Sequence, residues 1–569
     1  MTTAEIRAGN VTGDKTVAEK GDAEPAPRTR WNKLESLLDR IGDRLNPILI
    51  KEARQAMKSR QFVVTFSLLL LCGWLWTALF VLTGLPAIYY APVGPGVLIG
   101  YYVVLSVPLL IVVPYAAFRS LAGEWEDGTF ELLSITTLSA RQIVAGKLAS
   151  AVLQMMVYYS ALAPCIAFTY LLRGIDIITV ALLLGYSFVA SLLLSAFGLM
   201  MATVTRVRHW QVLISVVLVM ALLVFTFVWN MSFIAFLGEG GTLPLDVSEF
   251  WIAHLCGLSF YVPAVLLLLF VAAGQITFAS ENRSTPIRVL LLVPHALLVG
   301  WFIYLWRRVG HEEALYSLMM AGAAYWTIAG AVLTGETAEL SPRALRRLPQ
   351  SFLGRMLFTW FNPGSATGYV FVVANLAALI VVAFVLPASG PLPTPTMTGG
   401  LFRPLPAFDA WLSLALCLLG YVAGYLGATR LLVIAGRRFT YVGMPAAFLC
   451  HLLLIGGGVL IPLLVQRAVT GWSYSNFSYS LIQVPNWAWS LIEVARTGRT
   501  PLRAEITVMV TLIGGSIFLA NFLLAAHEVQ HTRQSAPQRV IQDELALHPS
   551  TATQKKRNPW DNLADAGQS

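Results

Sequence analysis

The acidic residues with the closest spacing fall in one stretch, GEWEDGTFELLSITTLSARQIVAGK, which covers residues 123–147. Four carboxylates lie within eight residues of it, although only 12% of the chain is charged. We expect Glu124, Glu126 and Asp127 to begin a short helix, because the helix macrodipole favours negative charge there. Phe130 and Leu133, three residues apart, would give this helix one apolar face for docking. The pattern favours a docking segment over a set of catalytic groups.

A second stretch, HEVQH at residues 527–531, matches the zinc-binding pattern H-E-x-x-H. At helical spacing His527 and His531 share a face and could bind zinc, with Glu528 as general base. A third ligand would have to come from Asp543, Glu544 or His548. The motif stands at the end of the last apolar run. Histidines there have a simpler explanation, because a helix C-terminus favours positively charged side chains. We therefore expect no metal and keep a membrane-embedded zinc protease as an alternative.

The composition is that of a membrane protein. The chain has 569 residues, of which 57% are hydrophobic, and its mean hydropathy is +0.68. Repeated uncharged runs of about 20 residues predict an all-α polytopic membrane protein with about 12 transmembrane helices. The five cysteines lie in apolar runs without a C-x-x-C pair, which favours buried side chains over a metal site. The expected spans are 62–84, 97–118, 143–172, 177–204, 210–236, 250–279, 287–306, 314–334, 366–387, 408–428, 441–466 and 505–527.

The distribution of positive charge predicts the orientation. If the N-terminus is cytoplasmic, most of the 39 Lys and Arg residues fall on the cytoplasmic side. We therefore expect an integral plasma (cytoplasmic) membrane protein with both termini in the cytoplasm. The same basic face explains the net charge of +9 without nucleic acid, which we do not expect as a partner.

A short repeated pattern indicates that the chain has two six-helix halves. Gly123-Glu124 follows the second expected span, and Gly335-Glu336 follows the eighth. The expected organisation is a disordered cytoplasmic tail (1–30), an elbow helix (31–61), a first transmembrane half (62–283) with a coupling segment (120–147), a second half (284–528) and a cytoplasmic tail (529–569). If both halves exist, one chain is enough for a membrane pore. A single half would need a dimer.

The segment before the first span has the pattern of an amphipathic helix lying in the membrane interface. Asn46-Pro47 should interrupt it and start a second helix, since proline suits a first helical turn. Lys51 and Arg54 would then lie among lipid headgroups. The alternative is a soluble helix that pairs with another protein. The apolar positions that recur every three or four residues are Trp31, Leu34, Leu38, Ile41 and Leu45.

Two stretches resemble the permease subunit of ABC transporters of the type-two exporter class. The first is NPILIKEARQAMKSR, at the entry to the first span. The second is the acidic stretch, which follows the family pattern E-x-E-x-G-T-x-E-x-L-x-x-T-P-x-S and then G-K. Thr137 replaces the usual proline. The matching residues are Glu124, Glu126, Gly128, Thr129, Glu131, Leu133, Thr136, Ser139, Gly146 and Lys147.

The resemblance implies a transporter permease that works as an exporter and is not itself an enzyme. In that family the segment is a coupling helix that docks on an ATP-binding subunit. The coupling residues would be Glu124, Glu126, Asp127, Gly128, Thr129, Phe130, Glu131, Leu133, Thr136 and Ser139. Ser139 and Gln142 also form a capping box before the third span. The basic segment 339–355 would be a second coupling site.

The ATP-binding motor is expected on a separate chain. A P-loop needs G-x-x-x-x-G-K-[ST], whereas Gly146-Lys147 is followed by Leu148 and has Arg141 in place of the first glycine. No cofactor is therefore expected in this chain, and ATP with Mg²⁺ is expected on the partner. The expected partners are the ATP-binding subunit, membrane lipids, and another copy of this chain or a second permease chain. An ion-coupled transporter is disfavoured because the spans hold almost no carboxylates, and a non-transporting membrane scaffold stays as an alternative.

Overall fold

Helices make up the computed structural model, and no strand occurs among the residues that it describes. Twelve helices are long and apolar enough to cross a membrane, which confirms the predicted fold class. Helices span membranes because they satisfy their own backbone hydrogen bonds. The structure describes residues 46–84, 90–131, 138–205, 207–240, 243–277, 281–309, 313–337, 345, 348–349, 351–388, 408–440, 442–470, 478–496, 502–531 and 537–547.

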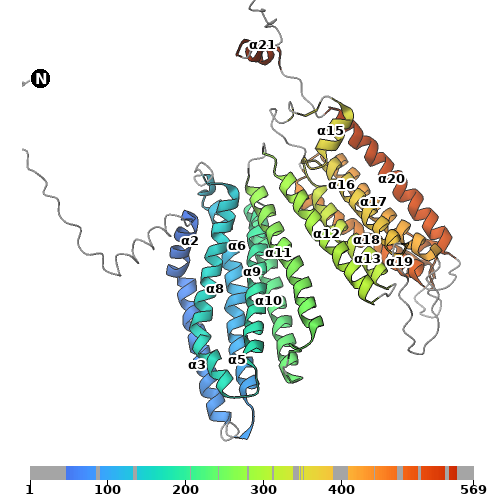
Figure 1. The fold of residues 1–569 in the computed structure, drawn as a ribbon. Coiled ribbons are helices and arrows are strands. Elements are labelled where there is room, and N and C mark those ends of the chain that lie inside the picture. Colours follow the sequence, from blue (N-terminus) through green and yellow to red (C-terminus); the bar gives the residue numbers. More distant parts are fainter. Residues whose placement is uncertain are drawn as a thin grey trace, which may run out of the picture.

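The spans are arranged as two bundles (Figure 1). The first contains α3 (Arg60–Gly84), the continuous α5 (Gly94–Val107) and α6 (Val113–Glu126), α8 (Ala140–Leu171), α9 (Ile177–Thr203), α10 (Arg208–Gly238) and α11 (Ser248–Ile276). The second contains α12 (Ser284–Val309), α13 (Glu313–Leu333), α16 (Ser365–Ala388), α17 (Phe408–Gly436), α18 (Met444–Thr470) and α20 (Arg503–His531). Each bundle has its own hydrophobic core.

The same neighbours recur in both bundles. The third span of the first bundle, α8, packs against the first, second, fourth and sixth spans, and α16 does the same in the second bundle. The second span also packs against the fourth and fifth in each bundle, and the fourth against the sixth. The twelve spans therefore form two six-helix sets with matching packing.

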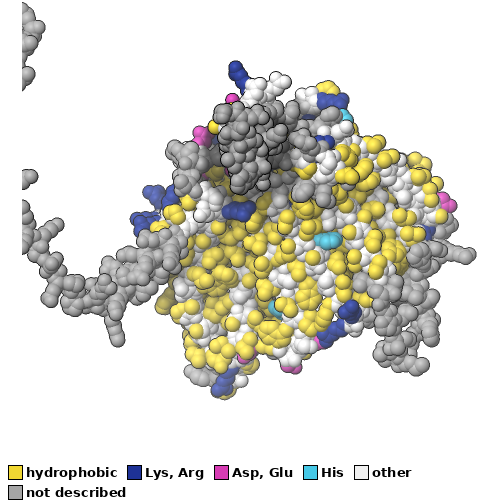
Figure 2. Space-filling model, turned by 45° about the horizontal axis from the view of Figure 1, so that its top comes forward, with side chains coloured by type: hydrophobic (Ala, Val, Ile, Leu, Met, Phe, Trp, Pro, Cys, Tyr) yellow, Lys and Arg dark blue, Asp and Glu magenta, His cyan; other side chains and the backbone are white. Residues whose placement is uncertain are grey.

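The flanks of the bundles are apolar. Large hydrophobic side chains such as Trp74 and Leu82 on α3 are exposed in the isolated chain. Figure 2 shows hydrophobic side chains over most of the visible flank, with charged side chains mostly near its rim. Such a surface is suited to lipid rather than water.

The short helices lie outside the spans. They are α2 (Pro47–Lys58), α15 (Phe352–Thr359), α19 (Trp487–Ala495) and α21 (Gln538–Leu547). Asn46 accepts a hydrogen bond from the backbone N–H of Ile48 and Pro47 occupies the first turn of α2, as predicted. The side chains of Lys51 and Arg54 are exposed. The predicted amphipathic residues Trp31, Leu34, Leu38, Ile41 and Leu45 lie outside the described residues.

Helix α2 packs closely against α8 because of one glycine. A Cβ atom at Gly146 would lie 2.9 Å from Nδ2 of Asn46 and 3.1 Å from Cβ of Ile48. Asn46 also donates from Nδ2 to the backbone carbonyl of Gln142 over 2.5 Å. Ser59 separates α2 from α3, and its Oγ accepts from the N–H of Phe62 over 3.1 Å. The elbow is therefore joined to the start of the third span.

Replacing Gly146 should separate α2 from α8. We expect Gly146→Leu to destabilise the protein by about 2 kcal/mol, because overpacking a closely packed contact typically costs that much. The thermal unfolding midpoint in detergent would show it as a decrease. Gly185→Leu is the matched control, since a Cβ atom there meets no atom within 4 Å. Equal midpoints for the two variants would contradict this account of the contact.

Candidate functional site

The second span continues further than the sequence predicts and ends inside the acidic stretch. Helix α6 runs through Glu124 to Glu126, so these carboxylates lie at a helix C-terminus and not at a helix start. The expectation that Glu124 and Glu126 begin a helix was therefore wrong, although helical residues do resume at Phe130 and Glu131, directly after this turn. Helix α6 ends because Gly128 takes a left-handed conformation with φ of +68°, which glycine adopts without a steric penalty. Negative charge at a helix C-terminus is unfavourable and needs a compensating cation.

Lys147 supplies that cation from α8. Its ammonium donates to Oε1 of Glu124 over 3.0 Å, to Oε1 of Glu52 over 2.8 Å and to the backbone carbonyl of Ser120 over 2.8 Å. The side chain of Lys147 is fully buried, and those of Glu52 and Glu124 are about nine-tenths buried. Lys51 approaches Glu124 from the exposed side, at 3.7 Å. We call Glu52, Glu124 and Lys147 the lysine cluster.

The lysine cluster links three segments that are distant in sequence. Glu52 comes from α2, Glu124 from the end of α6 and Lys147 from the first turns of α8. A buried ammonium is tolerated only when its donors are satisfied, and here all three have acceptors. Removing one partner would leave a charge that is buried and uncompensated. The cluster therefore fixes the elbow and the second and third spans relative to one another.

The other predicted coupling residues divide into buried and exposed ones. Phe130 is buried and stacks on Trp125, with ring centroids 3.8 Å apart. The expectation that Phe130 offers an apolar docking face was therefore wrong, because α6 itself covers it. Glu126 pairs with Arg119 over 3.1 Å. The exposed residues are Glu126, Asp127, Gly128, Thr129 and Glu131.

The segment that follows enters α8 as the sequence predicted. Ser139 accepts from the N–H of Gln142 over 3.3 Å, and Oε1 of Gln142 accepts from the N–H of Ser139 over 2.9 Å. This is the predicted capping box, which satisfies the first N–H groups of the helix. Leu133 and Thr136 lie outside the described residues.

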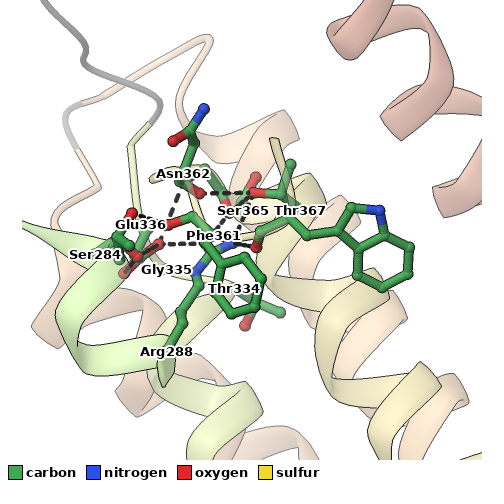
Figure 3. A network of polar contacts seen from close by, with 12 residues as sticks. Ser284, Arg288, Thr334, Gly335, Glu336, Phe361, Asn362, Ser365 and Thr367 are labelled. Atoms are coloured by element: carbon green, nitrogen blue, oxygen red, sulfur yellow. Dashed lines mark hydrogen bonds and ion pairs between the residues drawn. The ribbon is translucent and has the colours of Figure 1, made fainter. Parts of the chain in front are cut away.

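The second bundle has a comparable buried ion pair at the same end (Figure 3). The carboxylate of Glu336, just after α13, accepts a hydrogen bond from Nη2 of Arg288 over 2.6 Å and another from the hydroxyl of Ser284 over 2.9 Å. Arg288 also donates to the backbone carbonyls of Trp360 over 2.6 Å and Gly364 over 3.0 Å. The side chain of Arg288 is fully buried. This arginine cluster joins α12, the end of α13 and the start of α16.

The two clusters have the same acid but different cations. Glu124 and Glu336 each follow a glycine at the end of the second span of their bundle. The cation comes from the third span in the first bundle and from the first span in the second. The sequence analysis missed Glu52, Arg288 and the role of Lys147. The repeated Gly-Glu pair and the single lysine within the third span were the signals that pointed to them.

The HEVQH motif has a different environment from a zinc site. Oε1 of Glu528 accepts from Nη2 of Arg430 over 2.7 Å. Arg430 is fully buried on α17 and also donates to Oδ1 of Asn521 over 2.8 Å. The side chain of His531 lies outside the described residues. Within the part of the chain that is described, no three His, Cys, Asp or Glu side chains form a group that could hold a metal ion.

Comparison of the chain with protein-family models, with curated proteins and with solved structures found no match.

Removing the ammonium of Lys147 should destabilise the protein strongly. We expect Lys147→Met to cost about 3 kcal/mol, because two carboxylates stay buried without their cation. Glu52→Gln in the same chain should recover part of the loss, since the two substitutions affect one cluster. Equilibrium unfolding in mixed micelles measures both. Arg119→Met, which breaks the exposed pair with Glu126, is the control and should cost less than about 1 kcal/mol. Similar costs for Lys147→Met and Arg119→Met would contradict the role of the cluster.

Metal analysis tests the zinc alternative. We expect the purified protein to carry no stoichiometric zinc, because Glu528 is held by Arg430. The zinc content should then be the same before and after His527→Ala. One zinc per chain that disappears in His527→Ala would instead support the protease.

Proposed function

We propose that this chain is the permease subunit of an ATP-driven (ABC) transporter, with export as the direction of transport. The resemblance of the stretches at residues 46–60 and 123–147 to that family supports the proposal. So does the physical connection between them, because the lysine cluster joins α2 from the first stretch to α6 and α8, which border the second. This connection is the observation that carries the proposal.

The connection gives a mechanical path from a docked subunit to the membrane. A rigid group of packed elements transmits a displacement, whereas separate flexible loops absorb it. Residues 127–131, which follow α6, come directly after the lysine cluster. A force on these residues would therefore act together on the elbow and the first three spans.

The exposed acids among residues 127–131 favour a basic partner. Asp127 and Glu131 are exposed at the tip beyond α6, while Glu124 is turned inward and Phe130 is covered. Electrostatic complementarity between a rim of this kind and a basic groove contributes to orientation and rate of association. We therefore place the contact with the ATP-binding subunit at Asp127 and Glu131, where the sequence alone favoured Glu124 and Phe130. ATP and Mg²⁺ would bind the partner.

The proposed setting is the plasma membrane with the α2 end of the bundles in the cytoplasm. The start of α3 and the end of α20 lie at the same end of the molecule (Figure 1). The excess of Lys and Arg at that end supports a cytoplasmic position. The twelve spans in one chain support a pore built without a second permease chain.

Charge reversal at the tip should release the ATP-binding subunit. We expect Asp127→Lys with Glu131→Lys to reduce co-purified ATPase activity by at least about tenfold, since it replaces attraction by repulsion at the contact. The protein would be purified from its own membranes, and the ATPase identified by its P-loop peptide. Glu239→Lys with Asp246→Lys is the control, because these acids are exposed at the opposite end of the first bundle. A wild-type preparation without any P-loop ATPase would favour the membrane scaffold, and equal ATPase in both double variants would contradict the assigned contact.

A further inference from the structure

The two bundles meet along α11 and α12, and a groove runs along this seam. Its volume is about 530 Å³, within the range of ligand sites in proteins. The walls are mostly apolar and come from both helices. The indole Nε1 of Trp301 donates to Oγ of Ser259 over 2.9 Å, so a hydrogen bond between two lining residues joins the bundles. The other walls include Ile252, Leu255, Ala296, Leu297 and Gly300.

Arginines stand where the groove reaches the end of the span. A second hollow of about 480 Å³ shares Gly300 and Tyr304 with the groove and is lined by Arg307 and Arg308. These residues follow one another at helical spacing, so they form one stripe along α12. The stripe ends at the membrane surface that is opposite to the one at which α2 lies.

The two arginines differ in whether a carboxylate neutralises their positive charge. Arg308 is paired with Glu249 over 2.7 Å and donates to the hydroxyl of Tyr304 over 2.6 Å. Arg307 is exposed, and among the described residues it has neither an ion pair nor a hydrogen bond. Within the described part of the chain, the guanidinium of Arg307 is therefore a positive charge without a counter-ion at the mouth of an apolar groove.

The dimensions fit an acyl chain with a headgroup. From Ala296 to Arg307 the helix rises about 16 Å, which is about half the thickness of the hydrocarbon core of a bilayer. An apolar tail placed along the groove would bring a phosphate to the level of the arginines.

We propose that the seam between α11 and α12 binds one anionic phospholipid. Its acyl chain lies in the groove at Gly300 and Trp301, and its phosphate is bound by Arg307. Glu249 weakens the binding by neutralising Arg308. The site is independent of the proposed docking of an ATP-binding subunit, which lies at the opposite end of the bundles.

Lipid retention by the full chain tests the proposal. The protein would be purified in detergent with equal amounts of phosphatidylglycerol and phosphatidylcholine of the same acyl chains, and the retained lipid measured by mass spectrometry. We expect wild-type protein to retain phosphatidylglycerol in preference. Arg307→Gln should lower that preference about fivefold, the effect of one cation near a membrane surface. Glu249→Gln should raise it, because it releases Arg308 from its ion pair.

Filling the groove should remove both lipids from the site. A Cβ atom at Gly300 meets no atom within 4 Å, so Gly300→Leu places its side chain in the groove without straining the helix. Gly257→Leu is the control, because Gly257 on α11 is equally open but does not line the groove. Arg208→Gln controls for a cation at another span end.

Each result of the lipid-retention measurement either supports or overturns the proposal. Equal retention of the two lipids by wild-type protein would overturn the proposal, as would equal effects of Arg307→Gln and Arg208→Gln. Retention by Gly300→Leu at the wild-type level would overturn the placement of the acyl chain. If Gly300→Leu fails to fold, the opposite effects expected for Arg307→Gln and Glu249→Gln still decide the matter, since both residues are exposed.

Discussion

The buried ammonium of Lys147 is the interaction on which the proposed coupling end depends. It neutralises a carboxylate at the C-terminus of α6, where the macrodipole would otherwise oppose the charge. It also holds the elbow through Glu52. Gly146, the residue before it, lets α2 come close enough for this contact. Gly146 thus allows the close approach of the helices, and Lys147 compensates the charge. Neither role is phosphate binding.

The second bundle repeats the packing of the first but not the charge at this end. Glu336 occupies the place of Glu124, yet its cation comes from α12, and among the described residues no helix equivalent to α2 precedes that span. The exposed acids Asp127 and Glu131 have their counterpart in a segment with several arginines, most of which lies outside the described residues. Two bundle ends with the same helix packing and different surface charge would contact a partner differently. If both ends contact an ATP-binding subunit, as proposed, the two contacts would be unequal.

The sequence predicted the spans well because hydrophobicity over about 20 residues is a local property. It predicted the capping box at Ser139 and the helix start at Pro47 for the same reason. It failed at Glu124 and Phe130, since the direction of a side chain there depends on Lys147 and Trp125, which only the fold brings into contact. Glu52 and Arg288 were missed because surface and buried charges look alike in a sequence. The seam between α11 and α12 has no sequence signature at all.

The central claim is that ATP on a separate subunit moves the α2 end of the bundles. Pulsed electron paramagnetic resonance would measure it most directly, with spin labels at positions 58 and 439, after Cys72 and Cys450 are replaced by serine. Lys58 and Phe439 are both exposed at this end, and neither belongs to the proposed contact with the ATP-binding subunit. The account predicts that ATP shifts the distance distribution between the labels in the complex with its ATPase and leaves it unchanged in the isolated chain. Identical distributions with and without ATP in the complex would contradict it.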